Sequence, residues 1–304
     1  MIIAHKIALD PNNAQETFFR KSAGCARFAF NWGLEQWQAQ YQAGQTPSEG
    51  ALRRHLNAIK AEHYPFLLEV PKTVIQQAIK NLGTAFTRFF ENVREGRRVG
   101  PKHNPFGYPQ FKKRGLDDSF RIDNGPPQAG RDAVKVDGKR LYVPKLGWVR
   151  MREAVRVEGQ IKSAVVSGTA GRWFVSLAVE LGDLVSVRKN HATVGVDLGV
   201  KALATLSTGE QVEGPKPLRK LLKKLARLQR KLARAVKGSA NRKKLKARVA
   251  RLHARIANIR QDALHKLTSD LAGRFSLIGI EDLNVKGMLK NSRLSRSIAD
   301  MGFG

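Results

Sequence analysis

The segment Thr193-Val194-Gly195-Val196-Asp197-Leu198-Gly199 decides the fold of the C-terminal part of the chain. Its apolar run predicts a buried strand, and Asp197 places a carboxylate where a central strand is normally apolar. We expect residues 201–208 to continue as a second short strand, Gly209 to turn the chain, and residues 211–213 to return beside it. The pattern predicts an antiparallel meander with an aspartate in its first strand.

A second apolar strand, residues 275–280, ends directly on Glu281-Asp282. A buried aspartate on one strand and an acid at the end of another are unfavourable unless a ligand compensates their charge. Converging carboxylate oxygens suit Mg²⁺ or Mn²⁺, which prefer oxygen ligands. The residues therefore predict a divalent-metal site formed by Asp197 and an acid of the pair Glu281-Asp282.

The strongest concentration of positive charge lies between these two strands. The 304 residues hold 55 Lys and Arg against 25 Asp and Glu, a formal net charge of +30. Residues 216–266 alone hold 19 of these cations and one acid, Asp262. Apolar residues recur at spacings of three and four on both sides of a break at 237–239, which predicts an antiparallel pair of helices. These apolar residues are Leu218, Leu221, Leu225, Leu228 and Leu232, followed by Leu245, Val249, Leu252, Ile256 and Ile259.

The other faces of this predicted hairpin carry cations at i and i+4, which repel one another because no acids separate them. A run of charge that is merely solvated is the alternative interpretation. A phosphate backbone would neutralise the cations, so we expect the hairpin to bind nucleic acid. The side chains that we assign to binding are Lys223, Lys224, Arg227, Arg230, Lys231, Lys243 and Lys244.

The overall composition narrows the class of protein. Hydrophobic residues make up 42% and charged residues 26%, as is typical of a globular chain. No stretch approaches the ~18 apolar residues of a transmembrane helix, and residues 1–10 lack the apolar centre of a signal peptide. The single cysteine, Cys25, excludes a disulfide framework and a Cys-based zinc site within these residues. We therefore expect a cytoplasmic protein without membrane association.

The N-terminal half divides into a helical and a β-rich part. Residues 11–96 have the apolar spacing of helices, and their aromatic side chains, Phe90 among them, are expected in the core. Residues 133–181 alternate in hydropathy, with Asp137-Gly138 as a hairpin turn signal. We predict a small antiparallel β-domain, a partly closed barrel, into which a strand at residues 1–9 pairs.

Two fold families open with an Asp-Leu-Gly strand of this kind. In actin-like ATPases it begins a phosphate-binding hairpin, and a second Asp-Gly loop and glycine-rich adenosine contacts follow. In ribonuclease-H-like nucleases, an aspartate on the first strand, an acid on the fourth strand and one later acid hold two metal ions. After Gly214 the chain offers the basic hairpin, the strand at 275–282 and a short tail. The nuclease fold therefore fits better.

Several longer stretches match one family in the expected order. They are Val70-Pro-Lys-Thr-Val-Ile-Gln-Gln-Ala78, Tyr108-Pro-Gln-Phe-Lys-Lys-Arg114, Asp118-Ser-Phe-Arg-Ile122, Gly195-Val-Asp-Leu-Gly-Val-Lys-Ala-Leu-Ala-Thr-Leu206 and Ile280-Glu-Asp-Leu-Asn-Val-Lys-Gly-Met288. Together they resemble the TnpB (OrfB) family, transposon-encoded relatives of type V CRISPR effector nucleases. The resemblance covers essentially the whole chain, whereas Asp-Leu-Gly alone would be a weak signal.

The resemblance implies a transposase-type protein that binds a guide RNA and cuts the paired target DNA, with Mg²⁺ or Mn²⁺ at the catalytic residues Asp197 and Glu281. It also implies an α+β multi-domain fold. The implied parts are a β-barrel-like wedge domain (1–10 and 101–185), an inserted helical recognition domain (11–100), and a RuvC-like, ribonuclease-H-like α/β domain (191–304) carrying the basic helical hairpin (216–266).

Two further sets of residues have a place in this scheme. Lys72 and Gln76, four apart after a proline, resemble the family position that reads a motif flanking the target DNA. An ordinary polar helix face is the alternative. Lys112, Lys113 and Arg114 lie among aromatic residues, as on surfaces that follow a nucleic-acid backbone. A small core under a basic loop is the alternative there.

The sequence also departs from the family pattern. Such proteins normally continue into a zinc-binding ribbon with two Cys-x-x-C pairs and a third catalytic Asp, and these 304 residues contain neither. Asp300 does not match the surroundings of that third acid, and we expect it to be a solvated helix residue. With two of three carboxylates we expect weak metal binding and slow cleavage. Two hypotheses follow: an RNA-guided DNA endonuclease, or a catalytically inactive remnant that still binds RNA and DNA.

Overall fold

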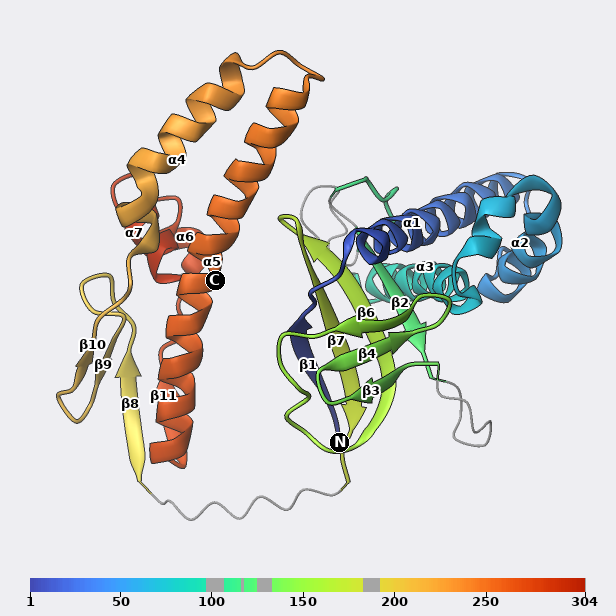
Figure 1. Cartoon of the computed structure of the whole chain (residues 1–304). Coiled ribbons are helices and arrows are strands. Elements are labelled where there is room, and N and C mark those ends of the chain that lie inside the picture. Colours follow the sequence, from blue (N-terminus) through green and yellow to red (C-terminus); the bar gives the residue numbers. More distant parts are fainter. Residues whose placement is uncertain (97–106, 116–117, 125–132, 183–191, 304) are drawn as a thin grey trace. The chain divides into compact units, whose positions relative to one another are not determined.

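The computed structural model describes residues 1–96, 107–115, 118–124, 133–182 and 192–303. The chain divides into two compact units, Met1–Leu184 and Val185–Gly304 (Figure 1). Each unit has its own hydrophobic core, so each is described by itself.

The first unit contains two antiparallel sheets. One has the strand order β1 (Ile2–Ala8), β7 (Arg172–Glu180), β6 (Gln160–Thr169) and β2 (Ser119–Asp123). The other consists of β3 (Lys135–Asp137), β4 (Arg140–Val143) and β5 (Gly147–Arg150).

The predicted β-rich region is therefore confirmed, including the pairing of the N-terminal strand along its length with β7. Gly138 lies in the predicted turn with φ of 53°, a backbone conformation that favours glycine. An isolated bridge between Leu9 and Met151 links the two sheets.

The described residues of the first unit form the helices α1 (Asn13–Gln42), α2 (Glu49–His63), the 3₁₀ helix η1 (Pro65–Glu69) and α3 (Lys72–Arg94). Of these, α1 and α3 pack on the four-stranded sheet, and α2 and η1 pack against other helices. Asn12 and Gln15 form a capping box at the start of α1. Phe19 of α1 contacts Phe120 and Trp173 of the sheet, with ring centroids 5.9 and 5.3 Å apart. Helices and sheet thus share one core, as the apolar spacing predicts.

Two side chains of the first unit differ from simple expectation. Phe90, which we expected in the core, is 51% exposed because it lies on the outer side of α3, where it stacks against Phe86. Cys25 is buried, and this burial raises the pKa of its thiol from 9.0 to about 11, with Lys21 lowering it and Glu69 raising it to smaller extents. The buried thiol stays protonated at neutral pH.

The second unit is built on a mixed sheet. Its strand order is β10 (Gln211–Val212), β9 (Ala204–Leu206), β8 (Thr193–Asp197) and β11 (Leu277–Ile280). The first three pair antiparallel, as the predicted meander requires, and β11 pairs parallel to β8.

Two long helices connect β10 to β11, namely α4 (Pro217–Arg234) and α5 (Ala240–Arg274). They form the predicted antiparallel hairpin, shown in Figure 1, with Leu225, Leu252 and Ile256 buried between them. The second helix does not end at residue 266 as predicted but continues to Arg274. Toward its C-terminal end, α5 packs against the sheet rather than against α4. Its residues Leu267 and Leu271 lie in one hydrophobic cluster with residues of β8.

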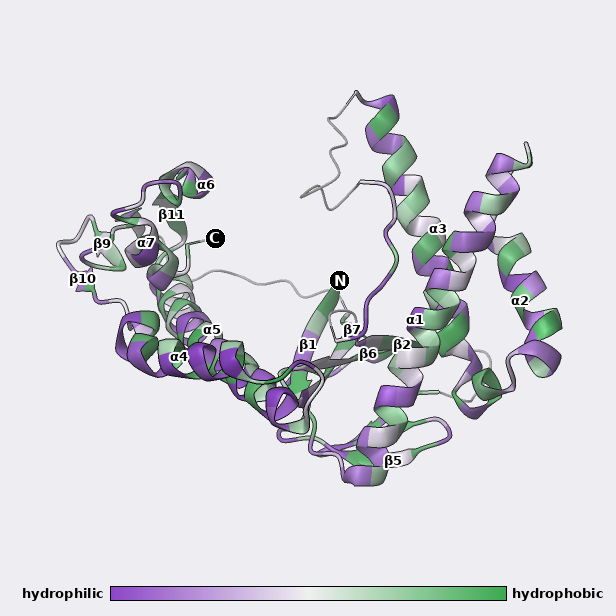
Figure 2. Ribbon diagram, turned by 90° about the horizontal axis from the view of Figure 1, so that it is seen from above, coloured by the Kyte–Doolittle hydropathy of each residue, from purple (hydrophilic) through white to green (hydrophobic). Residues whose placement is uncertain are grey.

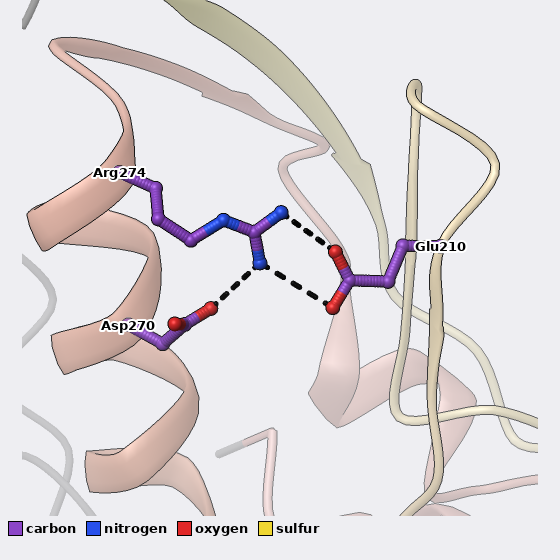
Figure 3. A network of polar contacts seen from close by, with 3 residues as sticks. All are labelled: Glu210, Asp270 and Arg274. Atoms are coloured by element: carbon purple, nitrogen blue, oxygen red, sulfur yellow. Dashed lines mark hydrogen bonds and ion pairs between the residues drawn. The ribbon is translucent and has the colours of Figure 1, made fainter.

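An ion-pair network fastens the end of α5 to the sheet (Figure 3). Arg274 holds Glu210 in the β9–β10 turn with both terminal nitrogens, at 2.7 and 3.3 Å, and also contacts Asp270 at 2.9 Å. The Glu210 carboxylate, followed by Asp270, raises the pKa of the Arg274 guanidinium above its ordinary value. The fork geometry suits a bidentate pair and orients the turn relative to the helix.

Two short helices follow β11, α6 (Val285–Met288) and α7 (Ser295–Met301). The buried Met301 of α7 belongs to the core of the second unit. Among the residues that the structure describes, no helix is long and apolar enough to cross a membrane.

Candidate metal and nucleic-acid site

The pairing of β8 with β11 brings the two predicted metal ligands to one edge of the sheet. Gly195 is opposite Gly279 and Val196 is opposite Ile280 in the parallel register. Asp197 is the last residue of β8, and Glu281 follows β11 directly. Because neighbouring strands lie about 4.8 Å apart, the same register continued by one residue places these two acids side by side.

Neither carboxylate is buried, which corrects our expectation. Along β8, Val194 and Val196 are buried, whereas Asp197 alternates to the opposite, exposed face. The apolar run was interpreted as a strand covered on both faces, but the second face of β8 is uncovered in the described part of the chain. β11 is an edge strand with Leu277 65% and Ile280 68% exposed, and Glu281 after it is exposed too.

The surroundings of the two acids leave their oxygens available. Among the described residues, neither Asp197 nor Glu281 takes part in an ion pair or side-chain hydrogen bond, and no group of three or more His, Cys, Asp and Glu gathers to hold a metal. Mg²⁺ is commonly held by one or two carboxylates together with substrate phosphates and waters. Two exposed carboxylates at adjacent strand ends therefore fit such an ion.

The two glycines before the acids leave part of the sheet face that carries Asp197 without side chains. Gly195 and Gly279 are paired and exposed, and neither has a positive φ. A Cβ on Gly195 would meet Ser207 at 3.7 Å, and one on Gly279 would meet the Val194 carbonyl at 3.9 Å, which are ordinary contacts. The protein's own fold therefore does not require glycine here, and the bare backbone permits close approach of another molecule.

All seven hairpin cations that we assigned to nucleic-acid binding are exposed. They are Lys223, Lys224, Arg227, Arg230 and Lys231 on α4, with Lys243 and Lys244 on α5. Figure 2 shows many hydrophilic residues along α4 and α5. Of the 19 cations in residues 216–266, only Arg260 and Lys266 form ion pairs within the described part of the chain.

Side chains from α5 and α7 cap the two ends of α4. At its C-terminal end, the Arg242 guanidinium of α5 donates to the carbonyls of Leu232 and Ala235, at 2.8 and 2.9 Å. At its N-terminal end, Asp300 of α7 accepts from the backbone N–H groups of Leu218 and Arg219, at 2.7 and 2.9 Å. Capping of these otherwise unsatisfied groups fixes where the hairpin begins and ends.

Asp300 was wrongly expected to be solvated. It is 3% exposed, and besides the two N–H groups of α4 it contacts the Arg260 guanidinium at 3.2 Å. The start of α4 provided the missed signal: Lys216 cannot supply a capping side chain, Pro217 follows it, and the first turn holds no acid. A helix that begins in this way needs an acceptor from elsewhere.

Lys72 and Gln76 both lie in the first turns of α3, as predicted. Lys72 is exposed at the first helical position, and Gln76 is half-buried. Lys72 lines a pocket of about 380 Å³ together with Lys60, Lys145 and Pro71. The structure therefore places Lys72 near two other lysines. Contact of Lys72 and Gln76 with DNA stays a prediction.

The basic segment after Tyr108 is anchored to α1. The Lys112 backbone exchanges two hydrogen bonds with the Asn31 side chain, at 2.8 and 3.1 Å, and its ammonium lies 4.4 Å from the centroid of the Phe30 ring. Lys113 and Arg114 are exposed. Lys112 is therefore partly committed to packing, and the two residues after it are the accessible cations.

Two family profiles match the sequence. One, OrfB_IS605, described as "Probable transposase", matches residues 176–292, and a second, described as "Helix-turn-helix domain", matches residues 1–46. Over this second range the structure has the strand β1 followed by the single helix α1.

Curated relatives match along nearly the entire chain. "Putative RNA-guided DNA endonuclease InsQ" of Escherichia coli (strain K12) is 37% identical over 99% of this chain and 74% of its own length. A "Putative RNA-guided DNA endonuclease" of Streptomyces pristinaespiralis is 34% identical over 98% of this chain and 71% of its own. Among solved structures, one titled "Cryo-EM structure of the Cas12f1-sgRNA-target DNA complex" matches 96% of this chain and 71% of that one, with 13% identity and a TM-score of 0.46.

Proposed function

The chain belongs to the TnpB (OrfB) family of transposase-type proteins, and on this premise we propose that it is an RNA-guided, metal-dependent DNA endonuclease with Asp197 and Glu281 as its catalytic metal ligands. The observation that carries the proposal is the parallel pairing of β8 with β11, which sets both acids at adjacent strand ends. The relatives' names support guide RNA and target DNA as partners.

The order of strands supports a RuvC-like, ribonuclease-H-like domain in the second unit. An antiparallel meander of three strands is extended by a fourth strand parallel to the first. The two acids lie at the ends of the first and fourth of these strands, as we expect for that fold. In open α/β sheets, ligands bind preferentially beyond the carboxyl ends of the strands. Asp197 and Glu281 lie at these ends of β8 and β11.

Asp197 and Glu281 would hold Mg²⁺ or Mn²⁺, whose charge would stabilise a reacting phosphodiester and activate a water molecule. The chain's own residues make this site accessible to a metal ion and to DNA. The two carboxylates are exposed, so their oxygens reach a ligand without a conformational change. The bare backbone at Gly195 and Gly279 leaves room for a phosphate and its sugar on the same sheet face.

The basic hairpin would supply most of the affinity for nucleic acid. Apart from Arg260 and Lys266, its cations form no ion pair in the described residues, so a polyanion gains their full attraction. In the first unit, Lys72 and Gln76 are proposed to contact DNA. Lys112, Lys113 and Arg114 are proposed to contact a phosphate backbone, with Lys112 contributing less because it also packs on Phe30. The wedge and recognition domains implied by the resemblance would both belong to this unit.

Cleavage of a target duplex tests the catalytic assignment. The chain is incubated with its guide RNA, Mg²⁺ and a matching duplex, and Glu281→Gln is compared with the control Glu213→Gln, another exposed glutamate of the second unit. We expect the Glu281 variant to lose at least about a hundredfold in rate, since it removes a metal ligand. Cleavage that survives both Glu281→Gln and Asp197→Asn would contradict the assignment.

Metal binding provides a readout that does not depend on cleavage. Mn²⁺ titrations followed by electron paramagnetic resonance should show a bound ion whose affinity falls at least about tenfold in Asp197→Asn and Glu281→Gln, but not in Glu213→Gln. Guided DNA binding without cleavage, together with no bound Mn²⁺, would instead establish the catalytically inactive protein.

A further inference from the structure

A cavity of the second unit lies at the same end of the sheet as the two carboxylates. It has a volume of about 420 Å³ and is formed by the loop after β8, the start of α4 and the helix α7. Figure 1 shows these three elements at the end of the unit toward which β8 points.

The cavity is strongly positive. Four of its lining side chains, Lys201, Lys216, Arg219 and Arg296, are cations, and none of them forms an ion pair within the described residues. The one acid, Asp300, does not neutralise them, because its two oxygens already accept two N–H groups of α4 and a contact from the Arg260 guanidinium. The cavity therefore attracts an anion.

Contacts within the fold fix the positions of two of these cations, Lys216 and Arg219. The Lys216 ammonium donates to the Lys201 carbonyl at 3.1 Å, which fastens the start of α4 to the loop that follows β8. Arg219 lies in the first turn of α4, whose position is set by the buried Asp300. Lysine and arginine side chains at a helix start favour phosphate as their ligand.

The shape of the cavity indicates more than a free phosphate ion. Val200, Leu222 and Met301 line it together with the cations. Apolar side chains beside several cations suit a phosphate that carries an organic group, as in a nucleotide chain. This favours a phosphodiester over inorganic phosphate.

The sequence separation from Asp197 limits how far from the carboxylates the bound phosphodiester lies. Lys201 follows Asp197 by four residues, so their Cα atoms are at most about 14 Å apart. Phosphates of one DNA strand advance by about 3.4 Å each along the helix axis, so a Cα separation of that size corresponds to about four nucleotides.

We propose that this cavity binds a phosphodiester of the DNA strand that is cut, within about four nucleotides of the bond presented to Asp197 and Glu281, and so fixes the position of the cut. This inference rests on the proposed endonuclease function. Lys201, Lys216 and Arg296 act as positioning residues, because they hold the strand without contacting the reacting atoms.

Binding of single-stranded DNA in the presence of EDTA tests the cavity without any cleavage. The probe is a fluorescein-labelled 12-nucleotide oligothymidine, and the variant is Lys201→Gln/Lys216→Gln/Arg296→Gln. The control, Lys135→Gln/Lys139→Gln/Arg172→Gln, removes the same charge from exposed cations of the first unit that form no ion pair among the described residues. We expect the cavity variant to bind about tenfold more weakly than the control, because charge-assisted phosphate contacts are lost in addition to net charge. Equal affinities of the two triple variants would overturn the proposal.

Lysine acetylation followed by mass spectrometry provides a measurement on the unmodified chain. The oligothymidine should protect Lys201 and Lys216 from acetylation but leave Lys135 and Lys139 reactive. Unchanged reactivity of Lys201 and Lys216 at saturating oligonucleotide would overturn the proposal even if the triple variant failed to fold.

The position of the cut separates this proposal from the proposed function. With guide RNA and Mg²⁺, the control should cut at the wild-type position, whereas the cavity variant should cut at several neighbouring positions. Protection of Lys201 without any cleavage by the wild-type chain would leave the cavity standing and refute the endonuclease. Wild-type cleavage with an unchanged cut position in the cavity variant would refute the cavity alone.

Discussion

Replacement of Asp300 by asparagine tests whether this residue holds the start of the basic hairpin. Asn keeps the size of the side chain but replaces one acceptor oxygen by an NH₂ group, which would face an N–H donor of α4. Loss of a charged cap on two backbone N–H groups, with the weakened contact to Arg260, is expected to lower the free energy of unfolding by about 2 kcal/mol. For a unit of this size that corresponds to a fall of roughly 8 °C in Tm.

Hydrogen exchange locates the effect. About 2 kcal/mol of local destabilisation should speed exchange of the Leu218 and Arg219 amides about thirtyfold, while amides in the middle of α5 change less. The control is Asp262→Asn, which removes an exposed ion pair with Lys266 on α5 and should cost less than about 0.5 kcal/mol. If Asp300→Asn is no more destabilising than Asp262→Asn, the capping role is refuted.

Three further predictions concern charge, the bare sheet face and the buried thiol. Replacing Lys223, Lys224, Arg227, Arg230 and Lys231 together by Gln should lower the slope of log affinity for duplex DNA against log salt by at least about 2, since each phosphate contact contributes about 0.9; an unchanged slope would remove α4 from the interface. Gly195→Val should change stability by less than about 1 kcal/mol, because valine suits a strand and an added Cβ finds an ordinary contact, yet it should slow Mg²⁺-dependent DNA cleavage at least about tenfold by filling the bare face; unaltered cleavage would show that nothing approaches there. Because the folded Cys25 thiol keeps its proton to about pH 11 whereas the unfolded thiol loses it near 9.0, its contribution to stability is complete below pH 9.0 and declines between pH 9.0 and about 11. Urea unfolding of the wild type and Cys25→Ala at pH 8 and pH 10.5 measures that decline, and an equal pH dependence of both proteins would contradict it.

The elements that the sequence predicts well are those encoded by local periodicity. The leucines of α4 and the aliphatic residues of α5 repeat at helical spacing, so the hairpin follows from side-chain positions alone. The pairing of β8 with the strand before Glu281 was also anticipated, because two acids at strand ends make sense only if the strands meet.

What the sequence did not predict depends on neighbours distant along the chain. The exposure of Asp197 follows from which face of β8 is covered by α5, and an apolar run by itself does not show that. The continuation of α5 to Arg274 was missed because its apolar side changes partner from α4 to the sheet. The role of Asp300 requires the start of a helix 82 residues away, which only tertiary structure brings to it.

The pairing of β8 with β11 has a consequence for how the protein folds during synthesis. The two strands are separated by 84 residues, so β8 leaves the ribosome several seconds before its partner, at the usual rate of about 5–20 residues per second. In that interval the helical hairpin, which depends on contacts close in sequence, can form on its own. The pairing that sets Asp197 beside Glu281 closes the longest loop of the unit and is therefore made late. A nascent chain would thus acquire its affinity for polyanions before its two acids are aligned.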